Sequence, residues 1–134
     1  KAINEYKKNP NICTSYITQK KELTDIEIKL LKDKIFGCDV CQNKCPYNEN
    51  ISFSKIKEFK PLEFMENGKY EVYAEINNKA FKEKILPTSC GWRGKNIIKR
   101  NAIIRLHNRG VNIEKYKGDS PYLNKYIEIL FQIM

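Results

Sequence analysis

The chain has 134 residues, and its 25 lysines and arginines outnumber its 16 aspartates and glutamates, which gives a formal net charge of +9. This length allows one ordinary domain or two very small ones. No apolar run is long enough to cross a bilayer and the start shows no signal-peptide pattern, so we expect no membrane contact and a cytoplasmic location. The basic charge suits a polyanionic partner, most simply a nucleic acid. The alternative is a lysine-rich composition whose charges are only solvated.

The first clear element in chain order is a helix over residues 24–35. Thr24 and Glu27 have the spacing of a capping box, in which each side chain satisfies the other residue's backbone N–H. Gly37 is placed to end this helix. The apolar face of the helix consists of Ile26, Leu30 and Leu31.

The segment GCDVCQNKCPYN, residues 37–48, holds three cysteines at C-x2-C-x3-C-P spacing. The bacterial iron–sulfur run is C-x2-C-x2-C-x3-C-P, and its last cysteine ligates the other cluster where two are present. Ile35 stands where that run has its first cysteine. Cys13 is the nearest substitute, because a folded-back 24–35 helix would bring it beside Cys38.

We therefore expect Cys13, Cys38 and Cys41 to bind one [4Fe–4S] cluster and Cys45 to bind a second. The missing ligands would form one further cysteine run upstream of Lys1, and a start on lysine rather than methionine also indicates a piece of a longer protein. Two alternatives stay open, a single structural zinc on all four thiolates or a single cluster. The fifth cysteine, at position 90, is expected in a turn or partly buried and not as a ligand.

Residues 51–134 are expected to be helical. Short helices are predicted at 71–76, where a strand is the alternative, and at 78–86, and longer ones at 95–108 and 119–134. The 95–108 segment has apolar residues on more than one side, which is typical of a helix between neighbours. Such helix pairs resemble HEAT-type units. The expected fold is thus mainly α, with half of a ferredoxin-like double-cluster module over 1–50 and HEAT-like helices over 51–134.

Three segments together carry a family resemblance. CTSYIT at 13–18, IFGCDVCQNKCPYN at 35–48 and GWRGKNIIKRNAIIRL at 91–106 occur in the order in which similar motifs occur in the C-terminal part of bacterial epoxyqueuosine reductases. The departures are small: Tyr47 stands where the family often has Trp, and Cys90 where a small residue is usual.

The resemblance implies an enzyme that reduces epoxyqueuosine to queuosine at the wobble position of tRNA with a GUN anticodon. It implies two [4Fe–4S] clusters and cobalamin as cofactors, a ferredoxin or flavodoxin as electron donor, and a monomer. In this chain it implies iron–sulfur electron transfer and tRNA binding, with Ser15 and Asp39 near the cobalamin. No catalytic residue is expected here, so the isolated piece would be inactive.

Basic residues are the candidates for phosphate contacts, which position RNA without reading its sequence. The arginines are preferred because a guanidinium forks onto phosphate. Trp92 is expected as a core anchor and His107 as a helix-packing residue. The candidate RNA-binding residues are Lys20, Arg93, Lys95, Lys99 and Arg100.

Two other functions are compatible with these motifs. One is a ferredoxin-type electron-transfer module of another corrinoid reductase, which would share the cysteine motif but should lack the Arg-Asn-Ala helix. The other is a nucleic-acid-binding module with a structural zinc.

Overall fold

A computed structural model of the chain describes residues 3, 7–66 and 68–133. These ranges contain helices and turns, and the one β-type pairing among them is an isolated antiparallel bridge between Ile3 and Lys8. The mainly α prediction is therefore confirmed. The α-helices are α1 (Thr14–Gln19), α2 (Asp25–Leu31), α3 (Glu63–Glu66), α4 (Tyr70–Ala74), α5 (Asn78–Ala80), α6 (Lys95–Asn108) and α7 (Pro121–Ile133). Short 3-10 turns lie at Pro10–Ile12, Pro46–Asn48, Lys57–Phe59, Gly91–Arg93 and Glu114–Tyr116, and the π-helical turn Phe81–Ile85 continues α5.

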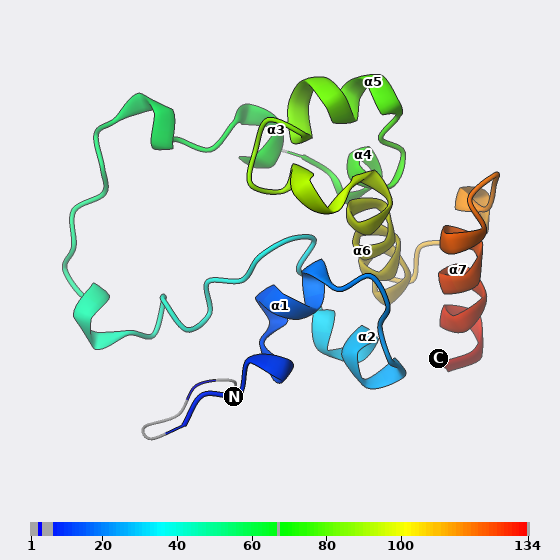
Figure 1. Cartoon of the computed structure of the whole chain (residues 1–134), viewed down its shortest axis with the longest axis horizontal. Coiled ribbons are helices and arrows are strands. Elements are labelled where there is room, and N and C mark those ends of the chain that lie inside the picture. The colour runs from blue at the N-terminus through cyan, green and yellow to red at the C-terminus, as the bar shows by residue number, and fades with distance from the viewer. Residues whose placement is uncertain (1–2, 4–6, 67, 134) are drawn as a thin grey trace.

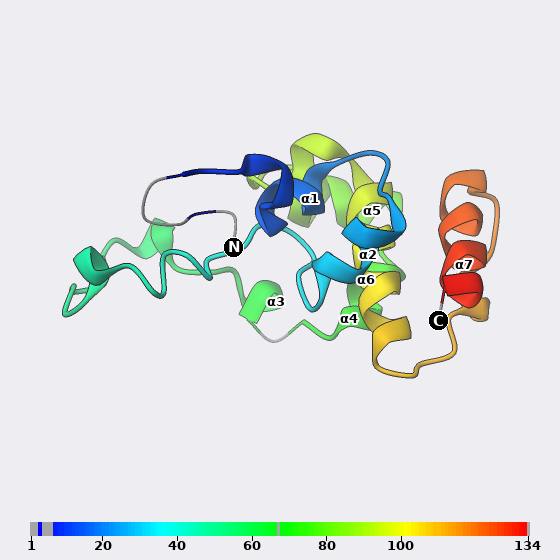
Figure 2. The same ribbon diagram turned by 90° about the horizontal axis from the view of Figure 1, so that it is seen from below.

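Helix α6 is the central element of the fold. It packs against α4 and α7 and also contacts α1 and α2 (Figure 1). Seen at right angles, α7 stands beside α6 on the side away from α1 (Figure 2). The prediction of a helix with neighbours on several sides is thus confirmed, and its predicted bounds, 95–108, are those observed.

The main hydrophobic core joins both predicted halves of the chain. Its first-half members come from α1 and α2, and its second-half members from α4, α6, α7 and the loop between α6 and α7. The boundary at residue 50 and the HEAT-like assignment of 51–134 stay predictions. Fully buried members include Ile17, Leu31, Ile103, Ile104, Leu106 and Ile127.

Residues 49–62 are exposed throughout and form a wide arc, drawn in cyan to green, that leaves the helical body and returns to it at α3 (Figure 1). The arc carries large apolar side chains in contact with water, among them Phe53, which is 90% exposed, and Phe59. The arc contributes no residue to the buried core within the described ranges.

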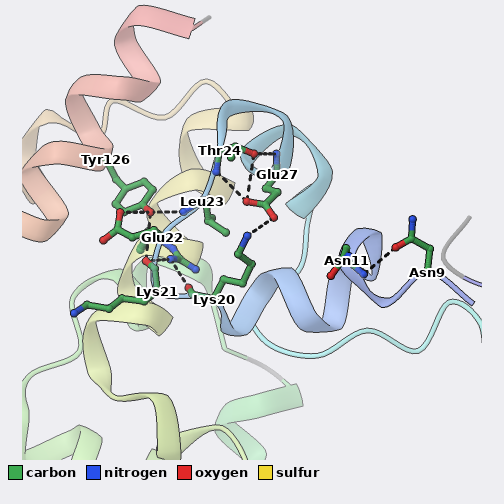
Figure 3. Close-up of polar contacts among 10 residues, drawn as sticks. Asn9, Asn11, Lys20, Lys21, Glu22, Leu23, Thr24, Glu27 and Tyr126 are labelled. Carbon is green, nitrogen blue, oxygen red and sulfur yellow. Dashed lines mark hydrogen bonds and ion pairs between the residues drawn. The ribbon is translucent and has the colours of Figure 1, made fainter.

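The predicted capping box is confirmed at the start of α2. The hydroxyl oxygen of Thr24 accepts a hydrogen bond from the Glu27 N–H at 3.3 Å, and the Glu27 carboxylate accepts one from the Thr24 N–H at 2.9 Å (Figure 3). Asn77 likewise caps α5, because its side-chain oxygen accepts from the Ala80 N–H at 2.8 Å. The capping signal of Thr24 and Glu27 therefore located the start of α2 correctly.

The predicted end of the first helix was wrong. Helix α2 ends at Leu31, and Lys32 has a φ of 50°, so the right-handed helix cannot continue to residue 35. The chain turns here because Ile35 and Phe36 pack into a second apolar cluster with Ile85 and Ile98. Gly37, with a φ of +71°, serves the later turn before Cys38 instead.

Of the two predictions about ring side chains, the one for Trp92 was wrong and the one for His107 agrees with the structure. Trp92 was expected in the core but is 62% exposed, because the Gly91–Arg93 turn places it outside the bundle. His107 packs edge-on against Phe131 of α7, with ring centroids 5.8 Å apart, as expected of a helix-packing residue.

In the described ranges, every helix is too short or too polar to traverse a membrane.

Replacing Thr24 with alanine should lower the free energy of unfolding by about 1 kcal/mol, because the first turn of α2 loses its capping oxygen. Urea denaturation of the parent and T24A proteins would measure the difference. The matched control is Ser52→Ala in the exposed arc, which should leave stability within about 0.5 kcal/mol of the parent. Equal stability of T24A and the parent would show that the capping box contributes nothing.

Candidate metal centre and nucleic-acid interface

Cys13, Cys41 and Cys45 lie in turns or beside helical turns that hydrogen bonds close, whereas Cys38 lies in irregular backbone after Gly37. Cys13 is the N-cap of α1, and its carbonyl accepts from the Ile17 N–H at 3.0 Å. Cys41 lies in a turn closed by the Asn43 N–H and the Asp39 carbonyl at 2.8 Å. Cys45 precedes the Pro46–Asn48 turn, which begins with a proline.

The cysteines form a set of free thiols. None of the five takes part in a disulfide; Cys41 is exposed and the others are half-buried. In the part of the chain that the structure describes, no three Cys, His, Asp or Glu side chains come together as a site for a single metal ion. An all-sulfur donor set suits iron–sulfur ligation.

A side-chain hydrogen bond connects α1 to the turn that leads to Cys38. The Gly37 N–H donates to the Thr18 hydroxyl at 3.0 Å, and that hydroxyl donates to the Ser15 carbonyl at 2.7 Å. Because Cys13 begins α1 and Cys38 follows Gly37, two of the predicted ligands belong to segments that touch. The segment after α2 thus folds back onto α1, and the approach of the Cys13 and Cys38 thiols to each other stays a prediction.

Ser15 and Asp39 lie close in sequence to predicted ligands, two residues after Cys13 and one after Cys38. Ser15 is half-buried on α1, and Asp39 is exposed at the start of the Cys41 turn. Their contact with cobalamin stays a prediction. Cys90 lies in the turn before Gly91 and is partly buried against the second apolar cluster; that it binds no metal stays a prediction.

Three of the candidate RNA-binding residues lie together at the start of α6. Arg93 is exposed, and its guanidinium carbon is 4.0 Å from the centroid of the Trp92 ring. Lys95 donates to the Asn78 side chain at 2.5 Å, and Lys99 follows one turn later on α6. Burial lowers the pKa of Lys99, and the positive charge of Lys95 lowers it further. We call Trp92, Arg93, Lys95 and Lys99 the α6 entry surface.

Lys20 lies apart from this surface, at the end of α1. Its ammonium group pairs with the Glu27 carboxylate at 2.5 Å (Figure 3). The hydrogen bond from Lys20 to Glu27 raises the pKa of Lys20. The lysine therefore stays charged, but a carboxylate already offsets much of that charge.

The expectation that Arg100 contacts RNA was wrong, because its side chain is 0% exposed. One nitrogen donates to the Lys20 carbonyl at 2.7 Å, to the Lys21 carbonyl at 2.9 Å and to the Tyr122 hydroxyl at 2.7 Å. The other two donate to the Asn101 side-chain oxygen at 3.0 and 2.8 Å. Because all three nitrogens are bonded inside the protein and the side chain is fully buried, a phosphate cannot reach the guanidinium.

Sequence reasoning missed Asn101 and Tyr126, which join α6 and α7 to the segment around α1. The Leu23 N–H donates to the Tyr126 hydroxyl at 2.8 Å (Figure 3). Asn101 is 1% exposed and donates to two backbone carbonyls. The available signal was an Arg-Asn pair in the middle of a helix with apolar residues on several sides, since buried polar groups need hydrogen-bond partners.

Comparison with known proteins gives matches to both halves of the chain. A family described as a 4Fe-4S double cluster binding domain matches residues 1–48. The chain is 40% identical over 105 residues to the epoxyqueuosine reductase of Listeria monocytogenes. The aligned region covers 78% of this chain and 28% of that protein. It is 34% identical over 105 residues to the Bacillus subtilis epoxyqueuosine reductase, covering 78% of this chain and 27% of the relative.

Solved structures give the same result. A crystal structure of an epoxyqueuosine reductase with an epoxyqueuosine-modified tRNA-Tyr stem loop superposes with a TM-score of 0.83 at 29% identity, over 95% of this chain and 36% of that one. The Streptococcus thermophilus epoxyqueuosine reductase superposes with a TM-score of 0.77 at 32% identity, over 96% of this chain and 36% of the reductase chain. The chain thus spans about a third of these structures and little more than a quarter of the two curated relatives. By sequence and by structure, it is homologous to part of the epoxyqueuosine reductases.

Proposed function

We propose that this chain provides iron–sulfur electron transfer and tRNA binding within an epoxyqueuosine reductase, the enzyme that reduces epoxyqueuosine to queuosine at the tRNA wobble position. The observation that carries the proposal is the combination of a double-cluster match over residues 1–48 with a 0.83 TM-score to a reductase holding a modified tRNA stem loop. A general electron-transfer module accounts for the first part alone. We further propose a cytoplasmic, monomeric enzyme with a ferredoxin or flavodoxin as donor and a GUN-anticodon tRNA as substrate.

Cys13, Cys38 and Cys41 are proposed to hold one [4Fe–4S] cluster, and Cys45 to hold a second. The hydrogen bond between Gly37 and Thr18 supports the first group, because it keeps the Cys38 turn against the helix that Cys13 begins. Cys41 follows within the next turn of chain. The separate role of Cys45 is supported by its place before a proline-initiated turn, as in two-cluster ferredoxins.

Thiolate ligation, hydrogen bonds to sulfur and solvent exposure set the reduction potential of such clusters. The half-buried Cys13 and Cys38 and the exposed Cys41 give one cluster both a protein side and a solvent side. Cobalamin would supply the chemistry that opens the epoxide. Ser15 and Asp39 would approach cobalamin from the ligand segments, and the catalytic acid would come from outside this chain.

The α6 entry surface is proposed to contact the tRNA. Arg93 offers a planar fork of donors to a phosphate, and its stacking on Trp92 restricts where that fork can lie. The exposed Trp92 ring can itself stack on an unpaired base, as aromatic side chains do in single-stranded RNA loops. Lys95 and Lys99 add positive charge along the same helix. Lys20 is a weaker candidate because Glu27 offsets its charge.

Replacing Cys41 with alanine in the full-length gene product should remove the cluster that Cys13 and Cys38 share. Bound iron and acid-labile sulfide should fall by about half, with a matching loss of the brown absorbance at about 400 nm, because one of two clusters is lost. The matched control is Cys90→Ala, which removes a thiol from a turn outside the ligand set and should leave the iron content unchanged. Parent-level iron in C41A would contradict the ligand assignment, and a colourless parent with stoichiometric zinc would favour the zinc alternative.

Reversing the charge of Arg93 with Arg93→Glu should weaken binding of the tRNA anticodon stem-loop and reduce the slope of log K against log salt by roughly 1, because one phosphate contact is lost. Binding titrations at several salt concentrations would measure both effects. Lys29→Glu is the control: it reverses a charge in the same way at an exposed position of α2, and the chain just after α2 lies beside Asn108 at the far end of α6. Equal salt slopes in R93E and K29E would remove Arg93 from the interface.

A further inference from the structure

The buried polar side chains of the described residues are Thr18, Arg100 and Asn101, and they form one connected network. Thr18 lies near the end of α1, whereas Arg100 and Asn101 lie in the middle of α6. Buried polar groups are costly unless they are fully hydrogen-bonded. A network of this kind therefore specifies how the two segments sit against each other.

Asn101 connects α6 to both ends of the segment between α1 and Cys38. Its side-chain nitrogen donates to the Thr18 carbonyl at 2.8 Å and to the Ile35 carbonyl at 2.7 Å. These two bonds use both hydrogens of the amide nitrogen. The Thr18 hydroxyl in turn accepts from the Gly37 N–H. The backbone is thus held at two points, Ile35 and Gly37, immediately before Cys38.

Arg100 fixes the orientation of the Asn101 amide. Two guanidinium nitrogens donate to the Asn101 oxygen. Because that oxygen is the acceptor, the amide nitrogen must face the Thr18 and Ile35 carbonyls. The third nitrogen binds the carbonyls of Lys20 and Lys21 just beyond α1. The Arg100 guanidinium therefore holds both the Asn101 amide and the C-terminal end of α1, which the amide contacts.

We propose that Asn101 and Thr18 are positioning residues for iron–sulfur ligation: Asn101, through the Thr18 and Ile35 carbonyls, and the Thr18 hydroxyl, through the Gly37 N–H, together set the separation between the Cys13 and Cys38 thiolates. The inference rests on the proposed function, since it requires these two cysteines to bind one cluster. Ligands that are distant in the chain must be brought to a fixed separation before a cluster can form between them. Groups that hydrogen-bond to the ligands of a metal centre, or to the segments that carry them, affect both its affinity and its electronic properties.

The test uses the full-length gene product with two variants that keep side-chain size. Asn101→Asp replaces the donating nitrogen with an oxygen that faces two carbonyls, and Thr18→Val removes the hydroxyl that accepts from Gly37. Thr18→Ser retains that hydroxyl and serves as the rescue variant. Ile127→Ala is the control, because it creates a cavity in the same core on α7 without removing any group of the network.

We expect N101D and T18V to change the electron paramagnetic resonance spectrum of the reduced clusters and to lower iron content toward half, whereas T18S and I127A keep the parent spectrum. In the metal-free protein, amide hydrogen exchange over residues 35–38 should be at least about tenfold faster in T18V than in T18S, because the turn opens locally. If N101D does not fold, T18V against T18S decides.

Full iron with a parent-like spectrum and parent-like exchange in T18V would overturn this inference while leaving the proposed function intact. A spectrum altered equally in I127A would also overturn it, since the effect would then follow from general destabilisation. Absence of iron from the parent protein would overturn the proposed function and this inference together.

Discussion

The buried guanidinium of Arg100 is the interaction on which the arrangement of this chain depends. Taking an ionised group out of water costs several kcal/mol unless hydrogen bonds replace those to the solvent. No ion pair to Arg100 occurs among the described residues, and its partners are instead the Lys20 and Lys21 carbonyls, the Tyr122 hydroxyl and Asn101. The two carbonyls lie just beyond the C-terminal end of α1, where the helix dipole favours positive charge. The end of α1 can therefore be buried only where α6 brings this guanidinium.

Helix α6 serves three purposes along its length. Its first turn and the residues before it present the α6 entry surface, its middle holds the buried polar pair, and its apolar sides pack against α4 and α7. Because α6 is a continuous helix of 14 residues, it acts as a rigid rod. The basic surface and the cysteine segment consequently keep a fixed relation to each other, although they are far apart in the sequence.

Features that depend on neighbouring residues could be predicted from the sequence, whereas features that depend on distant ones could not. The bounds of α6 and the capping box of α2 follow from periodicity and capping chemistry. The early end of α2 does not, since it results from burying Ile35 and Phe36 against residues of a later segment. Arg100 and Trp92 were placed on the wrong sides for the same reason. Nothing in a helix that is apolar on several sides tells which charged group will meet the carbonyls of α1.

The cysteine site likewise has a part that could be predicted from neighbouring residues and a part that depends on distant ones. Cys38 and Cys41 are close enough in the chain for their spacing alone to suggest a common cluster. Cys13 is remote, and bringing it to them closes a loop whose entropic cost must be offset by contacts elsewhere. Those contacts come from α6, through Asn101 and its two carbonyl partners, and not from the cysteine motif. Under the proposed ligand set, α6 is therefore part of the scaffold for the cysteines, and a cysteine-rich segment cut away from α6 would retain the motif but lose the two hydrogen bonds from Asn101.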